Sequence, residues 1–257
     1  MRKNIVGMLR GAVSASPCPA VLISGGLDST ILLHHLTELT GEKIHTYTVG
    51  LPEDNEFAEA RRVAQHYGTT HTELTAGNIA AEFAKVIPLL DRPRFNLWPL
   101  YAYIAAQRDG CQNIYIAEGL DEHFGGYENK PPATPQELWA GVIEWSLTTH
   151  RQLAAMHGMK LHTPFIRLPL KETIRYWRDP HTCGVAKAEL KKAYRGVIPK
   201  FVLERHKVGG RFNWENPVVW RREFSFLGEV PESHEEANRR VNVWATGRWL
   251  DARLPHR

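Results

Sequence analysis

Cysteines are scarce in this sequence, and their positions exclude two kinds of site. Three occur among 257 residues, Cys18, Cys111 and Cys183, and no two of them form a CxxC pair. We therefore expect neither a disulfide framework nor a cysteine zinc site. Sparse and unpaired cysteines are typical of a reducing compartment, so we expect a cytoplasmic location.

Long apolar runs are also missing. A membrane-spanning helix needs about 18 consecutive apolar residues, and no stretch of the chain approaches that length. Residues 1–16 superficially resemble an export signal, but Arg10 interrupts their apolar stretch, which predicts an amphipathic helix instead. We expect no membrane partner.

The chain carries no strong excess of charge of either sign. Its formal net charge is +4, and the basic residues are spread along it. This charge permits binding to polyanions, but a polyphosphate ligand accounts for it without a nucleic acid. With 43% apolar residues the chain can bury a good core.

What the sequence does contain is an alternation of apolar runs and helical patterns. Strands are expected at residues 20–23, 44–49, 70–74 and 113–117, with helices at 30–40, 56–67, 79–87 and 100–108. Strands joined by helices imply right-handed crossovers and a parallel sheet flanked by helices on both faces. Strand signals fade after residue 127. We therefore predict an α/β core at residues 1–128 and a mainly helical part at residues 129–257, together one continuous domain.

The strongest local signal is the sequence SGGLDS at residues 24–29, between a buried strand and a helix. Glycines let backbone N–H groups approach phosphate oxygens, the helix N-terminus adds partial positive charge, and the Ser24 and Ser29 hydroxyls add donors. Asp28 would repel a bare phosphate, which fits a role in holding the accompanying magnesium. The alternative is an ordinary turn in which Asp28 or Ser29 caps the helix. The GxxxxGK phosphate loop is absent, which argues against enzymes that cleave at the γ-phosphate.

A second signal is the sequence EGLDEHFGGY at residues 118–127, directly after the fourth expected strand. The carboxyl ends of parallel strands share one edge of a sheet, so this acidic loop would face the first loop. Asp121 could then join Asp28 on one magnesium ion. Acidic loops are usually solvated, and for Glu122 we expect that outcome.

A third signal is the basic sequence KAELK at residues 187–191, followed by RHK at residues 205–207 and two glycines. A glycine-containing segment that carries cations can close over a nucleotide and neutralise charge on a leaving group. Lys207 is our candidate for that role. A basic helix face in water is the expectation for Lys191, Lys192 and Lys200.

In order and spacing, SGGLDST, IHTYTVGL, EGLDEHFGGY, PFI and KAELKKAY with the later IP and RHK resemble the synthetase domain of the asparagine synthetases. Relatives of that family include β-lactam synthetases and lasso-peptide cyclases. The resemblance covers nearly the whole chain. It implies an adenine-nucleotide α-hydrolase fold and an ATP-dependent, AMP-forming ligase. Such an enzyme adenylates a carboxylate, releases pyrophosphate and joins the acyl group to ammonia or an amine.

The resemblance also implies a role for individual residues. Phosphates would be bound by the loop residues Ser24, Gly25, Gly26, Asp28 and Ser29, and magnesium by Asp28 and Asp121. Adenosine would be surrounded by Leu22, Val49 and the backbone at Ile116 and Ala117. Glu118 matches the glutamate that helps the amine attack, and Lys207 matches the catalytic lysine. Leu22 and Val49 also fit simple strand core, and both roles can hold together.

Departures from the family pattern concern the nucleotide pocket and the substrate. Ile116 and Ala117 replace the usual Ser-Gly pair, which predicts a tighter and more apolar pocket. Near the PFI motif, Lys160 and Arg167 stand where the family has acidic residues, so we expect different discrimination among charged substrates. The alternative is that this segment only packs helices and that its charges have drifted at the surface.

The nitrogen source follows from another departure. Glutamine-dependent members carry an N-terminal domain with a cysteine nucleophile directly after the initiator methionine, and here that position is Arg2. The resemblance therefore implies free ammonia, an amine substrate or a separate glutaminase partner.

Two other functions remain open at this point. A tRNA-modifying adenylating enzyme also fits an SGGxDS loop in a basic chain, although sulfur-transfer versions need paired cysteines, which this sequence lacks. A nucleotide-binding subunit without catalysis is the third hypothesis. Against it, all four expected active-site residues are present: Asp28, Glu118, Asp121 and Lys207.

Overall fold

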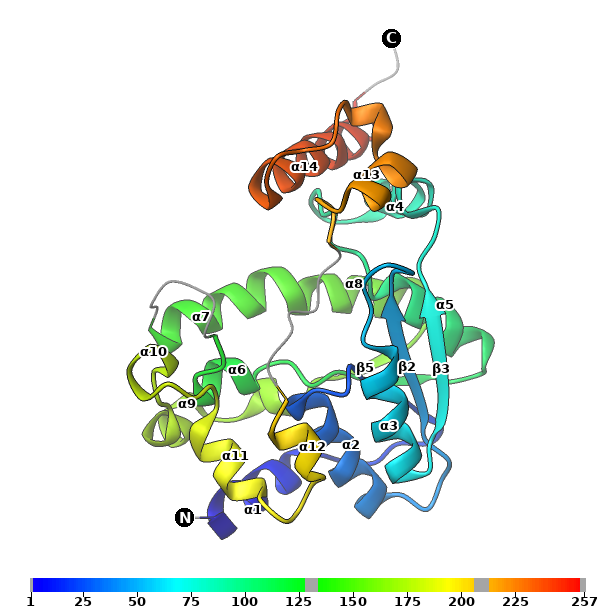
Figure 1. The fold of residues 1–257 in the computed structure, drawn as a ribbon. Helices are drawn as coiled ribbons and strands as arrows, with labels where there is room; N and C mark the ends of the chain where they lie inside the picture. Colours follow the sequence, from blue (N-terminus) through cyan, green and yellow to red (C-terminus); the bar gives the residue numbers. More distant parts are fainter. Residues whose placement is uncertain (1, 128–133, 206–212, 255–257) are drawn as a thin grey trace. The chain divides into compact units, whose positions relative to one another are not determined.

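The computed structural model describes residues 2–127, 134–205 and 213–254 (Figure 1). They form two compact units that alternate along the chain. The described part of the first unit comprises residues 2–48, 56–72, 102–127 and 134–205; that of the second comprises residues 49–55, 73–101 and 213–254. The predicted boundary between residues 128 and 129 lies in the segment 128–133, outside the described residues, and stays a prediction.

A five-stranded sheet has the strand order β3-β2-β1-β4-β5. Its strands are β1 (Pro19–Leu22), β2 (His45–Gly50), β3 (Thr70–Thr75), β4 (Asn113–Tyr115) and β5 (Lys160–His162). The central strand β1 pairs in parallel with both β2 and β4, and β4 pairs in parallel with β5. All four residues of β1 are buried, as a strand covered on both faces requires. The expected parallel sheet is thus confirmed, and β5 is a strand that the sequence pattern did not predict.

Helices flank the sheet and make up most of the chain after residue 134, as expected (Figure 1). The α-helices are α1 (Arg2–Ala12), α2 (Leu27–Leu39), α3 (Phe57–Tyr67), α4 (Ile79–Val86), α5 (Leu100–Arg108), α6 (Leu120–Phe124), α7 (Pro135–Gly141), α8 (Thr148–Met156), α9 (Leu170–Thr173), α10 (Pro180–Cys183), α11 (Ala188–Tyr194), α12 (Lys200–Leu203), α13 (Pro217–Glu223) and α14 (His234–Asp251). A π-helical segment, Val142–Leu147, joins α7 to α8 into one continuous rod in Figure 1. Among the described residues, no helix combines the length and the apolar character that a membrane crossing requires.

The predicted amphipathic helix at the start of the chain is α1. Ile5 and Leu9 lie four residues apart on one face of α1, and with Val13, directly after the helix, they are buried in the core of the first unit. The same core takes Ile31 and Leu36 from α2, which packs on β1. The apolar side chains thereby fix α2, and with it the loop that precedes it, against the central strand.

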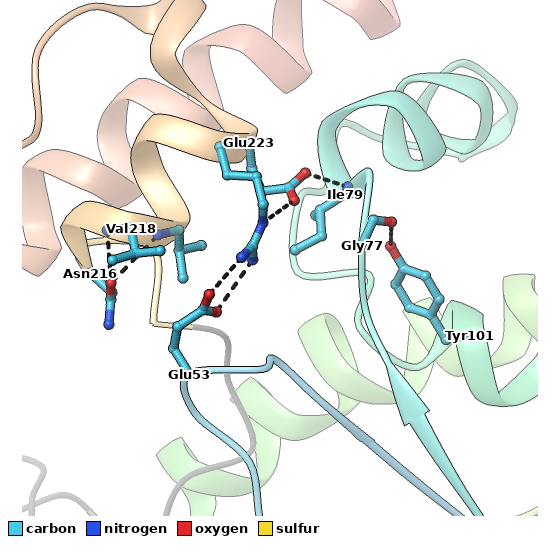
Figure 2. A network of polar contacts seen from close by, with 9 residues as sticks. Glu53, Gly77, Ile79, Tyr101, Asn216, Val218 and Glu223 are labelled. Carbon is cyan, nitrogen blue, oxygen red and sulfur yellow. Dashed lines mark hydrogen bonds and ion pairs between the residues drawn. The ribbon is translucent and has the colours of Figure 1, made fainter.

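In the second unit, one ion pair and one hydrogen bond join segments that are distant in sequence (Figure 2). Arg222 of α13 lies 2.6 Å from the Glu53 carboxylate and 2.8 Å from that of Glu223. The other oxygen of Glu223 accepts a hydrogen bond of 2.6 Å from the backbone N–H of Ile79. Because Ile79 is the first residue of α4, a carboxylate stabilises the positive end of that helix.

His150 makes the stability of the first unit sensitive to acid. This α8 residue is buried against the Tyr103 hydroxyl, 3.0 Å from its Nδ1, and burial lowers the pKa of the imidazole from 6.5 to about 4. Because the pKa is lower in the folded state, the stability that His150 contributes is complete above pH 6.5 and is lost as the pH falls toward 4. In urea unfolding, the parent should lose about 2 kcal/mol more between pH 7 and pH 5 than His150→Gln.

The exposed His181 provides the control for this measurement. His181→Gln should keep the pH dependence of the parent. Equal pH dependence in the parent and His150→Gln would contradict the prediction.

Candidate active site

The phosphate loop lies between β1 and α2 and is folded by its own hydroxyls. The Ser29 hydroxyl accepts from the Ser24 N–H and donates to the Gly26 carbonyl, each at 3.3 Å. Gly26 is the N-cap of α2, and as a glycine it makes no side-chain cap hydrogen bond. The alternative in which Asp28 or Ser29 is the cap is therefore wrong. The first N–H groups of α2 keep the positive helix end that favours an anion.

The backbone conformation and the closeness of α3 require glycine at position 25. Its φ angle is +69°, in the left-handed region, and an added Cβ would lie 2.6 Å from the carbonyl carbon of Glu59 in α3. Any other residue would force the loop away from α3.

Two carboxylates and one ammonium meet beside this loop. Lys187 forms ion pairs with Asp28 of α2 and with Asp121 of α6, the second at 2.7 Å. Burial alone would lower the pKa of Lys187, but the charges of Asp121 and Asp28 outweigh burial and raise it above its ordinary value. The structure thus brings together the two aspartates expected to share a magnesium ion, and it adds a lysine whose role the sequence analysis missed.

The backbone of Lys187 is itself unusual. Its φ angle is +54°, which is uncommon for a residue with a side chain, and its N–H donates to the Gly125 carbonyl at 2.9 Å. Left-handed residues of this kind persist where the surrounding structure holds them, often at functional sites. The hydrogen bond to Gly125 ties Lys187 to the same loop that carries Asp121.

Glycines in the acidic loop leave room for this contact. A Cβ on Gly126 would lie 1.6 Å from Asp121 Oδ1 and 2.6 Å from the Lys187 Cε. Gly125 has a φ of +72°, and its Cβ would lie 1.9 Å from the Arg178 carbonyl oxygen. The two glycines therefore let the ion pair and the neighbouring chain approach closely.

Glu118 lies at the start of the same loop, half-buried. Its Oε1 accepts a hydrogen bond of 2.9 Å from the Ser146 hydroxyl. Ser146 belongs to the π-helical segment Val142–Leu147, and π-helical turns occur frequently at functional sites. This contact fixes one oxygen of the carboxylate expected to assist the amine.

Glu122 differs from the expectation of a solvated side chain. It is 1% exposed, and Tyr127 donates a hydrogen bond to its Oε1. Burial and then the nearby charge of Asp121 raise the pKa of Glu122 to about 7. The expectation was wrong because the loop folds inward as α6, with Leu120 and Phe124 in the core.

Arg205, near the end of the first unit in sequence, contacts the phosphate loop. Its guanidinium donates to the Ser24 carbonyl at 2.8 Å and forms an ion pair with Glu56. Lys207, two residues further on, lies outside the described residues. The role expected of it stays a prediction.

The residues expected around adenosine lie on β1, on β2 and directly after β4. Val21 pairs with Tyr115 in the sheet, so Leu22 and Ile116, the next residues of each chain segment, are neighbours at its carboxyl edge. Both are buried, and Ala117 follows, half-buried. Val49 is a half-buried residue of β2 that belongs to the second unit.

Lys160 and Arg167, the two basic departures, have exposed side chains. Between them, His162 of β5 stacks on Tyr115 with ring centroids 4.2 Å apart, and Phe165 is fully buried. Altered substrate discrimination and surface drift around a packing segment both stay predictions for this segment.

The sequence is similar to a known protein family and to several known enzymes. A family model described as asparagine synthase matches residues 8–151. Asparagine synthetase B (glutamine-hydrolyzing) of Escherichia coli K12 is 28% identical over 222 residues, which are 73% of this chain and 40% of that protein. The glutamine-hydrolyzing asparagine synthetase of Gallus gallus is 27% identical over 220 residues, 72% of this chain and 38% of its own. The 7-cyano-7-deazaguanine synthase of Frankia casuarinae is 28% identical over 189 residues, 65% and 78% of the two chains. The chain thus spans well under half the length of the asparagine synthetases.

The glycine at position 126 gives a direct test of the site geometry. In Gly126→Ala the new methyl group displaces the Asp121 carboxylate, and we expect a loss of about 1–3 kcal/mol in the free energy of unfolding. Urea unfolding measures this loss. Gly247→Ala in α14, where an added Cβ meets no atom within 4 Å, should be neutral or slightly stabilising. A Gly126→Ala variant as stable as the parent would contradict the described contact.

Proposed function

The chain belongs to the asparagine synthase family, and from this premise we propose that it is an ATP-dependent, AMP-forming carbon–nitrogen ligase. It adenylates a substrate carboxylate, releases pyrophosphate and transfers the acyl group to ammonia or an amine. The observation that carries the proposal is the meeting of Asp28, Asp121 and Lys187 beside the phosphate loop.

The site residues fit a magnesium ion and a triphosphate. Two carboxylates and one ammonium carry a net negative charge, and hard carboxylate oxygens are the ligands that magnesium takes in proteins. Asp28 and Asp121 would hold the ion, which would neutralise charge on the phosphate oxygens. Lys187 contacts both carboxylates, so an ion shared by Asp28 and Asp121 would displace its ammonium from between them.

The phosphate loop binds and orients the nucleotide. The N-terminus of α2 and the hydroxyls of Ser24 and Ser29 would contact the phosphates, while Gly25 and Gly26 let the backbone approach. Leu22 and Ile116, with Ala117 and Val49, would surround adenosine. Holding ATP and the carboxylate in one site makes the attack on the α-phosphorus effectively intramolecular.

Glu118 would act in the second half of the reaction. Its carboxylate accepts a proton from the attacking nitrogen, or orients that nitrogen toward the adenylate carbonyl. Ser146 holds Oε1, which restricts the carboxylate to a narrow range of orientations.

Lys207 would neutralise charge on the leaving pyrophosphate. Support comes from its match to the family lysine and from Arg205, two residues earlier, whose guanidinium donates to the Ser24 carbonyl.

For the nitrogen donor we propose free ammonia, an amine substrate, or ammonia supplied by a separate glutaminase. The matched part is 40% of the E. coli relative, whose name states that it hydrolyses glutamine. A pyrophosphate-release screen across carboxylates, with ammonia supplied, identifies the substrate, and no release with any carboxylate would contradict the proposed reaction.

Asp28→Asn and Asp121→Asn should each lower the rate of pyrophosphate exchange into ATP by at least about 100-fold, because each removes one carboxylate from the proposed metal pair. Circular dichroism should show that both variants are folded. Asp251→Asn, at an exposed position of α14, is the matched control and should exchange at the parent rate. Parent-like exchange in both site variants would refute the magnesium assignment.

Lys207→Ala should slow adenylation far more than it weakens ATP binding, because charge on pyrophosphate develops mainly in the transition state. Exchange rates at varied ATP concentration separate the two effects. Equal losses would make Lys207 a ground-state binding residue instead.

Glu118→Gln should still exchange labelled pyrophosphate into ATP while making little amide, since its proposed role begins after adenylation. The parent should form product with ammonia or an amine but not with glutamine. Amide formation by Glu118→Gln at the parent rate would contradict the role, as would glutamine-dependent turnover by the isolated chain.

A further inference from the structure

A second cluster of reactive side chains lies at the amino ends of the strands, whereas the phosphate loop lies at their carboxyl ends. Cys18 directly precedes β1, His45 is the first residue of β2, and Cys111 lies two residues before β4. The sulfur atoms of Cys18 and Cys111 are 3.3 Å apart. One ligand atom from each of the three residues lies within 4.8 Å of the other two.

The position of this cluster follows from the strand register. Ala20 of β1 pairs with His45, and Pro19 pairs with Asn113 of β4, so the segments before the three strands meet at one edge. Cys18 and Cys111 are 93 residues apart in sequence. This distance is why cysteine spacing alone argued against a metal site.

We propose that Cys18, His45 and Cys111 bind one zinc ion. Zinc takes cysteine sulfur at about 2.3 Å and histidine nitrogen at about 2.0–2.1 Å in a tetrahedral arrangement, which places two sulfur ligands about 3.8 Å apart. The sulfur separation here is already close to that value, so small side-chain movements complete the site. Thiolate ligands disfavour magnesium and calcium, which take oxygen.

The backbone holds Cys18 in place for this role. Its φ angle is +44°, in the left-handed region, which is strained for a residue with a side chain. The Cys18 N–H donates to Glu42 Oε2 at 2.6 Å, and the Asn113 side chain donates to the Pro17 carbonyl at 2.8 Å. These two contacts fix the turn that brings the Cys18 sulfur next to Cys111.

Three protein ligands leave a fourth position on a tetrahedral ion. A water molecule would complete the coordination. Binding deprotonates the two thiols and releases their protons to solvent, with no change in oxidation state.

The proposed ion would tie β1, β2 and β4 together at their amino ends. A ligand that binds only the folded chain stabilises it by RT ln(1 + [L]/Kd). The effect is on stability, since the phosphate loop and the acidic loop follow the carboxyl ends of the strands. The test is therefore independent of the proposed ligase activity.

Zinc binding to the reduced, chelator-treated protein tests the proposal. The parent should bind one zinc ion per chain in competition with a chromophoric chelator, and its melting temperature should rise with zinc. Cobalt in place of zinc should give thiolate charge-transfer absorption and the visible bands of a tetrahedral site. Cys18→Ser, Cys111→Ser and His45→Gln should each weaken binding by at least about 10-fold.

Two controls separate this cluster from other candidate ligands. Cys183→Ser removes the exposed third cysteine. His34→Gln removes a histidine of the other cluster of possible ligands, His34, His35 and Glu38. Both variants should bind zinc like the parent.

Three results would overturn the proposal. The reduced parent could fail to bind zinc at micromolar concentration, a measurement that does not depend on any variant folding. Either control substitution could abolish binding. Mass spectrometry could find a Cys18–Cys111 disulfide in a chain that takes up no zinc after reduction, which would make the two cysteines a redox pair.

Discussion

A buried ammonium between two carboxylates is the interaction on which the candidate active site depends. Lys187 is 5% exposed, and taking its charge out of water is costly unless opposite charges lie close. Asp28 and Asp121 supply them from segments 159 and 66 residues away in the sequence. One side chain thereby joins the start of α2, the acidic loop and the segment before α11.

Such a contact requires local backbone geometry that ordinary residues resist. Lys187 itself adopts a left-handed conformation, and Gly126 leaves no room for even one methyl group beside Asp121. At Gly25, the backbone of α3 likewise leaves no room for a side chain. The ion pairs and the close contact at Gly126 therefore restrict the positions that the two site carboxylates can take.

The sequence predicted the parts of this structure that depend on local patterns. The apolar run of β1 and the four-residue repeat of α1 were visible because burial repeats with a regular period. The strand β5, with the sequence Lys-Leu-His, has no such run, and it is held by pairing with β4 and by the stacking of His162 on Tyr115. The prediction that Glu122 is solvated was also wrong, because its burial depends on the Tyr127 hydroxyl and on the packing of α6. Lys187 could not be assigned because its partners are far away in sequence.

The interleaving of the two units has a consequence for how this chain can be divided. The described chain passes from one unit to the other at residues 48/49, 55/56, 72/73 and 101/102. No single cut of the gene therefore yields either unit as one uninterrupted fragment. Contacts within each unit join segments distant in sequence, and non-local contacts of this kind slow folding because long loops must close before they form. Either half of the chain expressed alone would therefore contain incomplete pieces of both units.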